Sequence, residues 1–299
     1  MRPTFPTCVA VCVLPLVLVL AACGAGGSGG TGNLTAASDA AVETYISLDL
    51  ASGVFAAAGS DPVVTSDGRY RTTHVLLRRI TADTVTLGCE GNLSFDEEKV
   101  LRQVSYREFF CAVYELTQEQ WRRFAGTEPW AGAAFAGAYA DQTRSVGATL
   151  PAWGMSSDQA TAAAGTWSRD GWRIALPTHD QWEIACRAGT VNRLFPWGNT
   201  YTTMAIPRTF AVFAEPGATT VPYPAESKGQ RQANAWGLHD FIGNVWEYAL
   251  PVSGNQVEIR GGAFDQPLVA CRASHAMAVP SDIGLPTVGV RLVLLRVGD

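Results

Sequence analysis

The sequence is poor in charged residues and in histidine, and these shortages narrow the choice of function. Only 16% of the 299 residues are Asp, Glu, Lys or Arg, whereas 10% are aromatic. This balance is typical of a globular domain with a large core. The formal net charge is −5, and a protein that binds nucleic acid needs a basic surface for the phosphates. We therefore expect no nucleic-acid partner.

Several motifs of enzymes are missing as well. The sequence has no Gly-rich phosphate-binding loop and no GxSxG nucleophile elbow, and it shows no tandem repeat of solenoid length. Its four histidines follow neither an HxH nor an HxxxH spacing. We therefore interpret them as structural or surface residues: His74, His179, His239 and His275.

The N-terminus carries a strongly apolar run. Arg2 comes before residues 9–23, which end in Leu20-Ala21-Ala22-Cys23. One positive charge, an apolar core and small residues before the cut are typical of a secretory signal, so we predict a signal peptide over residues 1–22. The ending resembles the lipobox of bacterial lipoproteins, which implies a lipid on Cys23. An ordinary signal peptide or a single membrane anchor is the alternative.

A lipid on Cys23 implies a cell-envelope protein that is anchored to the membrane surface and faces the periplasm or the cell exterior. Residues 23–40 are rich in Gly and Ser, which predicts a flexible tether. Residues 41–80 read as a short β-rich extension, and residues 81–299 as the main domain.

Cysteine usage points to an oxidising compartment. Of the 7 cysteines, the cleavage removes Cys8 and Cys12 and the lipid takes Cys23. The four that remain are Cys89, Cys111, Cys186 and Cys271. An even count favours two disulfides with three possible connectivities. Four buried thiols are the alternative.

Two predicted strands carry the first pair of these cysteines. Residues 84–91 contain Cys89, and residues 107–117 contain Cys111. If the two strands pair antiparallel, a disulfide between these cysteines is geometrically easy. Further strands are predicted over residues 257–264 and 288–295.

Three helices begin with the same pattern. Thr117-x-x-Gln120, Ser156-x-x-Gln159 and Thr178-x-x-Gln181 each match the capping box, in which the hydroxyl and the amide satisfy free backbone N–H groups. The pattern predicts helix ends at Gly126 and Gly189 for the first and third helix, because a left-handed cap prefers glycine. Beyond residue 190 the chain is mostly rich in turns.

Seven segments, taken in order, carry a resemblance to one known family. They are similar to the formylglycine-generating enzyme, or sulfatase-modifying factor, domain: YELTQEQW (114–121), LPAWGMSSDQA (150–160), ALPTHDQWEIACRAGT (175–190), LFPWGN (194–199), NAWGLHDFIGNVWEY (234–248), IRGGAF (259–264) and GVRLV (289–293). The resemblance implies an α+β fold, an elaborated C-type-lectin-like domain with little regular secondary structure.

The resemblance also implies an oxidase chemistry that this chain departs from. Catalytic members oxidise a sulfatase cysteine to formylglycine with O₂ and a Cu(I) ion held by two cysteine thiolates, the soft ligands that Cu(I) prefers. Here Gln266 stands at the first cysteine position and Cys271 at the second. Because an amide cannot replace a thiolate, we expect no copper and no catalytic residue at this degenerate motif.

Two further expectations about this motif follow from the resemblance. We predict a disulfide between Cys271 and Cys186; a buried thiol or a residual redox or metal role is the alternative. The expected function is a non-catalytic binding or scaffolding module for an envelope protein, a peptide or a glycan. An oxidoreductase of the same family, which converts a protein cysteine to formylglycine with O₂, is the competing hypothesis.

A calcium site is the last expectation from the resemblance. In the family, the stretch that matches residues 240–247 surrounds Ca²⁺. The side chains of Asp240 and Glu247 and the carbonyls of Gly243 and Val245 supply the oxygen ligands that Ca²⁺ takes. The alternative is that Asp240 and Glu247 cap and pair locally.

Overall fold

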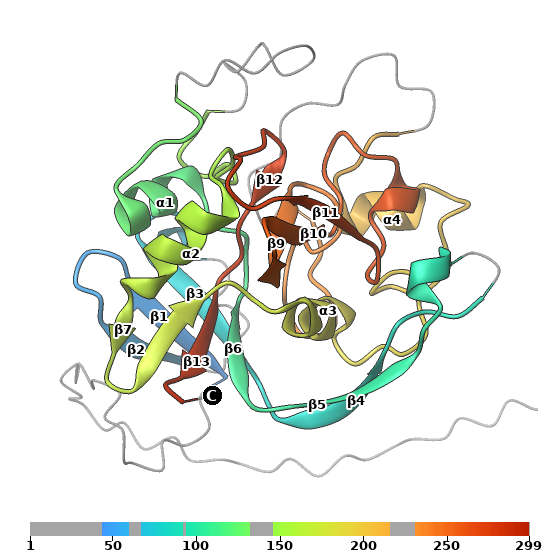
Figure 1. Cartoon of the computed structure of the whole chain (residues 1–299), viewed down its shortest axis with the longest axis horizontal. Coiled ribbons are helices and arrows are strands. Elements are labelled where there is room, and N and C mark those ends of the chain that lie inside the picture. The colour runs from blue at the N-terminus through green and yellow to red at the C-terminus, as the bar shows by residue number, and fades with distance from the viewer. Residues whose placement is uncertain (1–43, 60–66, 92–93, 132–145, 216–230, 299) are drawn as a thin grey trace, which may run out of the picture. The chain divides into compact units, whose positions relative to one another are not determined.

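Strands outnumber helices in the part of the chain that the structure describes. The computed structural model describes residues 44–59, 67–91, 94–131, 146–215 and 231–298 (Figure 1). All of them belong to one compact unit, residues 32–299. The predicted signal peptide, the lipidation site Cys23 and the tether lie outside the described residues. None of the described helices has the length and apolar character needed to cross a bilayer.

The largest sheet has seven strands, and every neighbouring pair in it is antiparallel. In sheet order they are β2 (Phe55–Gly59), β1 (Tyr45–Asp49), β3 (His74–Ile80), β6 (Phe109–Ala112), β13 (Val293–Arg296), β8 (Trp172–Ala175) and β7 (Ser168–Arg169).

The segment predicted as a separate extension, residues 41–80, contributes strands β1, β2 and β3 to this sheet. Strand β3 pairs with β1 on one side and with β6 on the other, so no boundary lies at residue 80 in the structure. The burial of β1 and β3 explains this arrangement. At most 3% of the surface is exposed at Ile46, Leu48 and Leu77. These side chains belong to the same hydrophobic cluster as Leu294 of β13.

A second sheet has four strands and lies close to the candidate site. Its order is β11 (Ala276–Pro280), β10 (Gln256–Arg260), β9 (Trp246–Ser253) and β12 (Val288–Gly289), and only the β12–β9 pair is parallel. A third, two-stranded sheet consists of β4 (Asp83–Leu87) and β5 (Arg102–Tyr106). We call residues 83–106 the arm; its strands are labelled below α3 in Figure 1.

The capping boxes predicted from the sequence are confirmed in all three helices. They open α1 (Gln118–Ala125), α2 (Ser157–Gly165) and α3 (His179–Arg187). Helix α1 ends at Gly126 as predicted, with φ 71°. Helix α3 takes its left-handed cap at Ala188, one residue before the predicted Gly189. A short fourth helix, α4 (Ala205–Phe210), follows.

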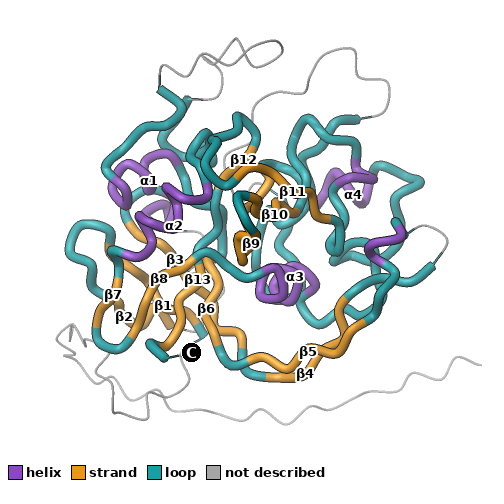
Figure 2. Tube along the Cα trace, in the orientation of Figure 1, coloured by secondary structure: helices purple, strands orange, loops and turns teal. Residues whose placement is uncertain are grey.

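Short 3₁₀ turns and long loops make up much of the rest. The turns used below are η2 (Gly68–Arg71), η3 (Asp96–Glu98) in the arm and η6 (Leu268–Ala270). Figure 2 shows loop over most of the described chain between α3 and β9. The turn-rich character predicted beyond residue 190 is confirmed.

The structure contradicts both predicted disulfides. All four described cysteines are free and buried, which is the alternative left open by the sequence. Cys89 follows β4, which pairs with β5, while Cys111 lies in β6, which pairs with β3 and β13. Strands β4 and β6 therefore belong to different sheets. The antiparallel pairing that would have made a Cys89–Cys111 disulfide easy is not formed.

Candidate functional site

Cys271 lies at the end of η6 in closely packed surroundings. Its side chain is fully buried, and its Sγ donates to the carbonyl of Pro267 at 3.6 Å. Gly262, with φ +76°, packs against it so closely that a Cβ there would come within 2.3 Å of the Cys271 Sγ. Burial raises the pKa of the Cys271 thiol well above its ordinary value. The thiolate, which is the form that binds a metal or attacks a substrate, is therefore disfavoured.

The residue at the first motif position has other partners. The Gln266 side chain donates from Nε2 to Asp265 Oδ1 at 3.2 Å, and its backbone carbonyl accepts from Ala214 at 2.8 Å. The Cys186 thiol, expected to pair with Cys271, is buried in α3, and burial raises its pKa too. No group of three or more His, Cys, Asp or Glu side chains that could hold a metal occurs in the described ranges.

The residue after Cys271 is held by the arm. Arg272 pairs with Glu98 of η3 at 3.1 Å, and both side chains are at least 98% buried. The Arg272 guanidinium also lies 3.5 Å from the ring centroid of Phe95, and its Nε donates to Val269 at 2.9 Å. The arm thus covers the segment that follows the degenerate motif.

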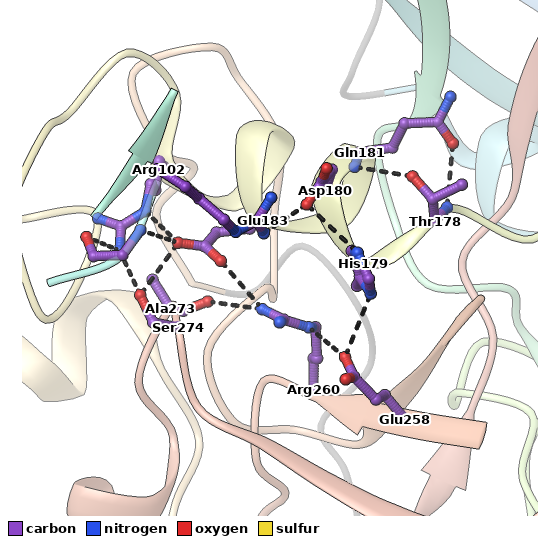
Figure 3. A network of polar contacts seen from close by, with 12 residues as sticks. Arg102, Thr178, His179, Asp180, Gln181, Glu183, Glu258, Arg260, Ala273 and Ser274 are labelled. Carbon is purple, nitrogen blue, oxygen red and sulfur yellow. Dashed lines mark hydrogen bonds and ion pairs between the residues drawn. The ribbon is translucent and has the colours of Figure 1, made fainter. Parts of the chain in front are cut away.

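A polar network fixes the same segment from the other side (Figure 3). Glu183 of α3 lies at its centre: Oε1 accepts from Gly88 N–H at 2.9 Å, Arg187 Nε at 2.8 Å and Ser274 Oγ at 3.0 Å. Its Oε2 accepts from Arg260 Nη1 at 3.2 Å. Burial alone would raise the pKa of the Glu183 carboxyl, but Arg187 and Arg260 outweigh that effect and lower it.

The outer part of the network ties the first turn of α3 to two neighbouring strands. Asp180 pairs with Arg102 of β5. His179 lies between Asp180, at 3.5 Å, and Glu258 of β10, at 3.8 Å. Glu258 in turn pairs with Arg260 at 3.3 Å. Helix α3 is therefore held by ionic contacts from the arm and from the second sheet.

The predicted calcium residues lie in the loop that leads into β9. Asp240 is 6% exposed and has φ +61°. Gly243 has φ +77°, and a Cβ there would come within 2.0 Å of the Val212 carbonyl. Val245 and Glu247 are each 1% exposed. The loop is thus buried, and Gly243 is required where the backbone passes Val212.

Both carboxylate oxygens of Glu247 are engaged by N–H donors. Its Oε1 accepts from Arg291 Nε at 3.1 Å and Nη2 at 2.7 Å. Its Oε2 accepts from Arg291 Nε at 2.9 Å and from Trp182 Nε1 at 2.7 Å. A carboxylate offers about four lone-pair positions, and three N–H groups occupy them here, because the single Arg291 Nε–H is shared between the two oxygens. The donor set as predicted therefore does not fit Ca²⁺ in this geometry, although calcium itself stays a prediction.

A second buried carboxylate beside this loop was missed by the sequence reasoning. Glu115 accepts from Val245 N–H at 3.2 Å and from the Asn244 amide. Burial, together with Asp240 and Glu247 nearby, raises the pKa of the Glu115 carboxyl well above its ordinary value. The Oδ1 of Asn244 is buried without a hydrogen-bond partner.

A small surface pocket opens beside the loop. This shallow hollow is open to solvent and is lined by Pro196, Trp197, Phe210, Gln232, Asn234, Leu238, Asp240, Phe241 and Ile242. Trp197 is stacked between Phe195 and Phe210, with ring centroids 4.7 Å and 5.3 Å apart. The pocket combines an aromatic wall with amide groups and one carboxylate.

The residues that the sequence reasoning missed are mostly buried charges paired over long distances. One signal was readable: Glu183 and Arg187 stand at i and i+4 on a predicted helix, a spacing that favours an ion pair. The partners Glu98 and Arg272, or Glu247 and Arg291, are separated by far more chain and carry no such signal.

Comparisons with known proteins agree with the sequence segments. A family model described as the sulfatase-modifying factor enzyme 1-like domain matches residues 64–295. The formylglycine-generating enzyme of Mus musculus is 38% identical over 80 residues, which cover 24% of this chain and 21% of that protein. The inactive C-alpha-formylglycine-generating enzyme 2 of Mus musculus is 25% identical over 127 residues, covering 36% and 37%.

These curated relatives are matched over only about a fifth to two fifths of their own length. A solved structure, variable protein 1 of Treponema denticola, is matched more completely. It has a TM-score of 0.60 at 17% identity and covers 74% of this chain and 95% of that one. At this identity the likeness shows a shared fold.

Proposed function

This chain belongs to the sulfatase-modifying factor family, and from that premise we propose that it is a member that binds or scaffolds and does not oxidise cysteine. The predicted family and its fold class, an elaborated C-type-lectin-like α+β domain, are confirmed. The observation that carries the proposal is the pair formed by Gln266 and Cys271. The copper chemistry of the family needs two thiolates at these positions.

The surroundings of Cys271 support the same conclusion. The thiol is fully buried, its pKa is raised by burial, and the Gly262 backbone fills the space beside it. Arg272 and Ser274, on the C-terminal side of Cys271, are held by Glu98 and Glu183. An active site that must admit a peptide and O₂ needs open space next to its thiol, whereas this segment is packed as a structural element.

The matched relatives include a formylglycine-generating enzyme and a protein named as its inactive counterpart. The choice between an oxidase and a non-catalytic module therefore depends on the residues of this chain. We place the module at the cell envelope, anchored through a lipid on Cys23. The chemical classes proposed for its ligand are an envelope protein, a peptide or a glycan.

The experiment is an oxidation assay on the purified domain. A sulfatase-type peptide with one cysteine is incubated with the domain, Cu(I) and O₂, and mass spectrometry follows the conversion to formylglycine. We expect no conversion. The Gln266→Cys variant is the matched control, because it places a second cysteine at the first motif position. Conversion of the peptide by the wild-type domain would overturn the proposal and favour the oxidase hypothesis.

A further inference from the structure

The two ends of the predicted calcium loop are tied together by one side chain. The Nη2 of Arg291 donates to the carbonyl of His239 at 2.8 Å and to Glu247 Oε1 at 2.7 Å. His239 immediately precedes the loop, and Glu247 is its last residue. A single nitrogen therefore joins the start of the loop to its end. A metal ion bound by both ends of a loop would connect them in the same way.

Arg291 is itself held in place from several sides. Its side chain is 0% exposed. Its Nη1 donates to the carbonyl of Ala112 in β6 at 2.9 Å, and its guanidinium lies 3.9 Å from the ring centroid of Phe241, inside the loop. The guanidinium stays charged in proteins at all ordinary pH values, so this buried position always carries a cation.

A calcium ion at Glu247 would have to displace this arrangement. Ca²⁺ takes six to eight oxygen ligands at about 2.3–2.6 Å, and both Glu247 oxygens already accept two hydrogen bonds each. Freeing either oxygen would leave the buried Arg291 guanidinium without part of its counter-charge. Removing the partner of a buried ion is strongly destabilising.

We infer that Arg291 is the internal cation of the 240–247 loop and that the loop keeps its conformation without a metal ion. This disagrees with the calcium expectation drawn from the family resemblance. It is independent of the proposed function, because a calcium-free loop is compatible with either a binding module or an oxidase.

The first test uses the wild-type domain, residues 41–299 with their native sequence. Metal content is measured by mass spectrometry after gel filtration in calcium-containing buffer, and the melting temperature is measured in EGTA and in excess CaCl₂. We expect no stoichiometric calcium and the same melting temperature in both solutions. One bound calcium per chain, or a melting temperature that falls in EGTA, would overturn the inference.

The second test removes the internal cation. The Arg291→Gln variant should melt at a lower temperature and should gain stability on addition of CaCl₂, because the buried Glu247 carboxylate then lacks the Arg291 charge. Arg296→Gln is the matched control: Arg296 is an exposed arginine at the end of β13, the strand that follows Arg291, and its loss should create no calcium response. An Arg291→Gln variant as stable as wild type would contradict the inference.

If Arg291→Gln does not fold, Arg291→Lys keeps the charge but gives up the forked contact with His239 and Glu247. This variant should fold, melt below the wild type and remain insensitive to calcium. If the melting temperature of Arg291→Lys rises with calcium, a positively charged side chain at residue 291 is not sufficient to hold the loop, and the inference is contradicted.

Discussion

Removing Arg272 should detach the arm from the segment beyond Cys271. In Arg272→Met, Glu98 is left as a buried carboxylate without its partner, because the two side chains pair at 3.1 Å and are 2% and 0% exposed. Breaking a buried ion pair from one side costs about 3–5 kcal/mol. For a domain of this size each kcal/mol shifts the melting temperature by roughly 2–4 °C, so we expect a drop of about 6–20 °C.

The assay is urea unfolding of the wild type, Arg272→Met, Glu98→Gln and the double variant. Glu98 also accepts from Phe95 N–H at 2.6 Å, and Gln can keep that contact while carrying no charge. The double variant should therefore recover at least half of the loss seen in Arg272→Met. Arg69→Met is the control, because the Arg69–Asp67 pair is about half exposed and exposed pairs contribute about 0–1 kcal/mol.

Two results would refute this reasoning. If Arg272→Met costs less than about 1 kcal/mol, the pair behaves like an exposed one and the arm does not depend on it. If the loss in the free energy of unfolding of the double variant equals the sum of the losses in the two single variants, the two residues contribute separately. The ion pair then does not couple the arm to the Cys271 segment.

The remaining predictions concern the buried acid, the thiols and the anchor. The pKa of the Glu115 carboxyl is raised in the folded state, so the folded state loses stability as the pH rises from the ordinary value of 4.5 through the raised value. The stability of Glu115→Gln relative to the wild type should therefore increase with pH. A stability difference that is constant between about pH 5 and pH 8 would contradict this. All four described thiols are buried, and burial raises the pKa of the Cys111 thiol to about 12. The native domain should therefore react with a thiol reagent at no cysteine and the unfolded domain at four; two or fewer reactive thiols after unfolding without reductant would restore the disulfides. Cys23→Ala should release the full chain from membranes, and a wild-type protein recovered wholly in the soluble fraction would exclude the lipid anchor.

The features that the sequence predicted well are local. Each capping box needs only a hydroxyl and an amide three residues apart, such as Thr117 and Gln120, and their hydrogen bonds form within one turn. The family segments predicted the fold for a different reason. Seven segments that match in the same order along the chain constrain the topology, although no single segment does. The degenerate motif was equally readable, because Gln266 and Cys271 stand at fixed positions relative to Gly262.

The features that the sequence did not predict depend on pairing across the chain. The antiparallel pairing that would have favoured a Cys89–Cys111 disulfide is not formed, because β4 pairs with β5 and β6 pairs with β3, a choice that local strand propensity does not decide. The saturation of Glu247 depends on Arg291, 44 residues away. Nothing in either local segment indicates that the two side chains meet in the core.

The place of β13 has a consequence for the order in which the molecule can form. This strand comes from the last residues described, yet it lies between β6 and β8 in the middle of the seven-stranded sheet. Its residues Val293 and Leu294 pair with Cys111 and Phe110 on one side and with Ala175 and Ile174 on the other. Until residues 293–296 emerge from the ribosome or from a translocation pore, the strands on either side have no partner to join them. A chain that ends before residue 293 would lose the strand that joins β6 to β8. The four strands on one side and the two on the other would then each expose an unpaired strand edge of the kind that promotes aggregation.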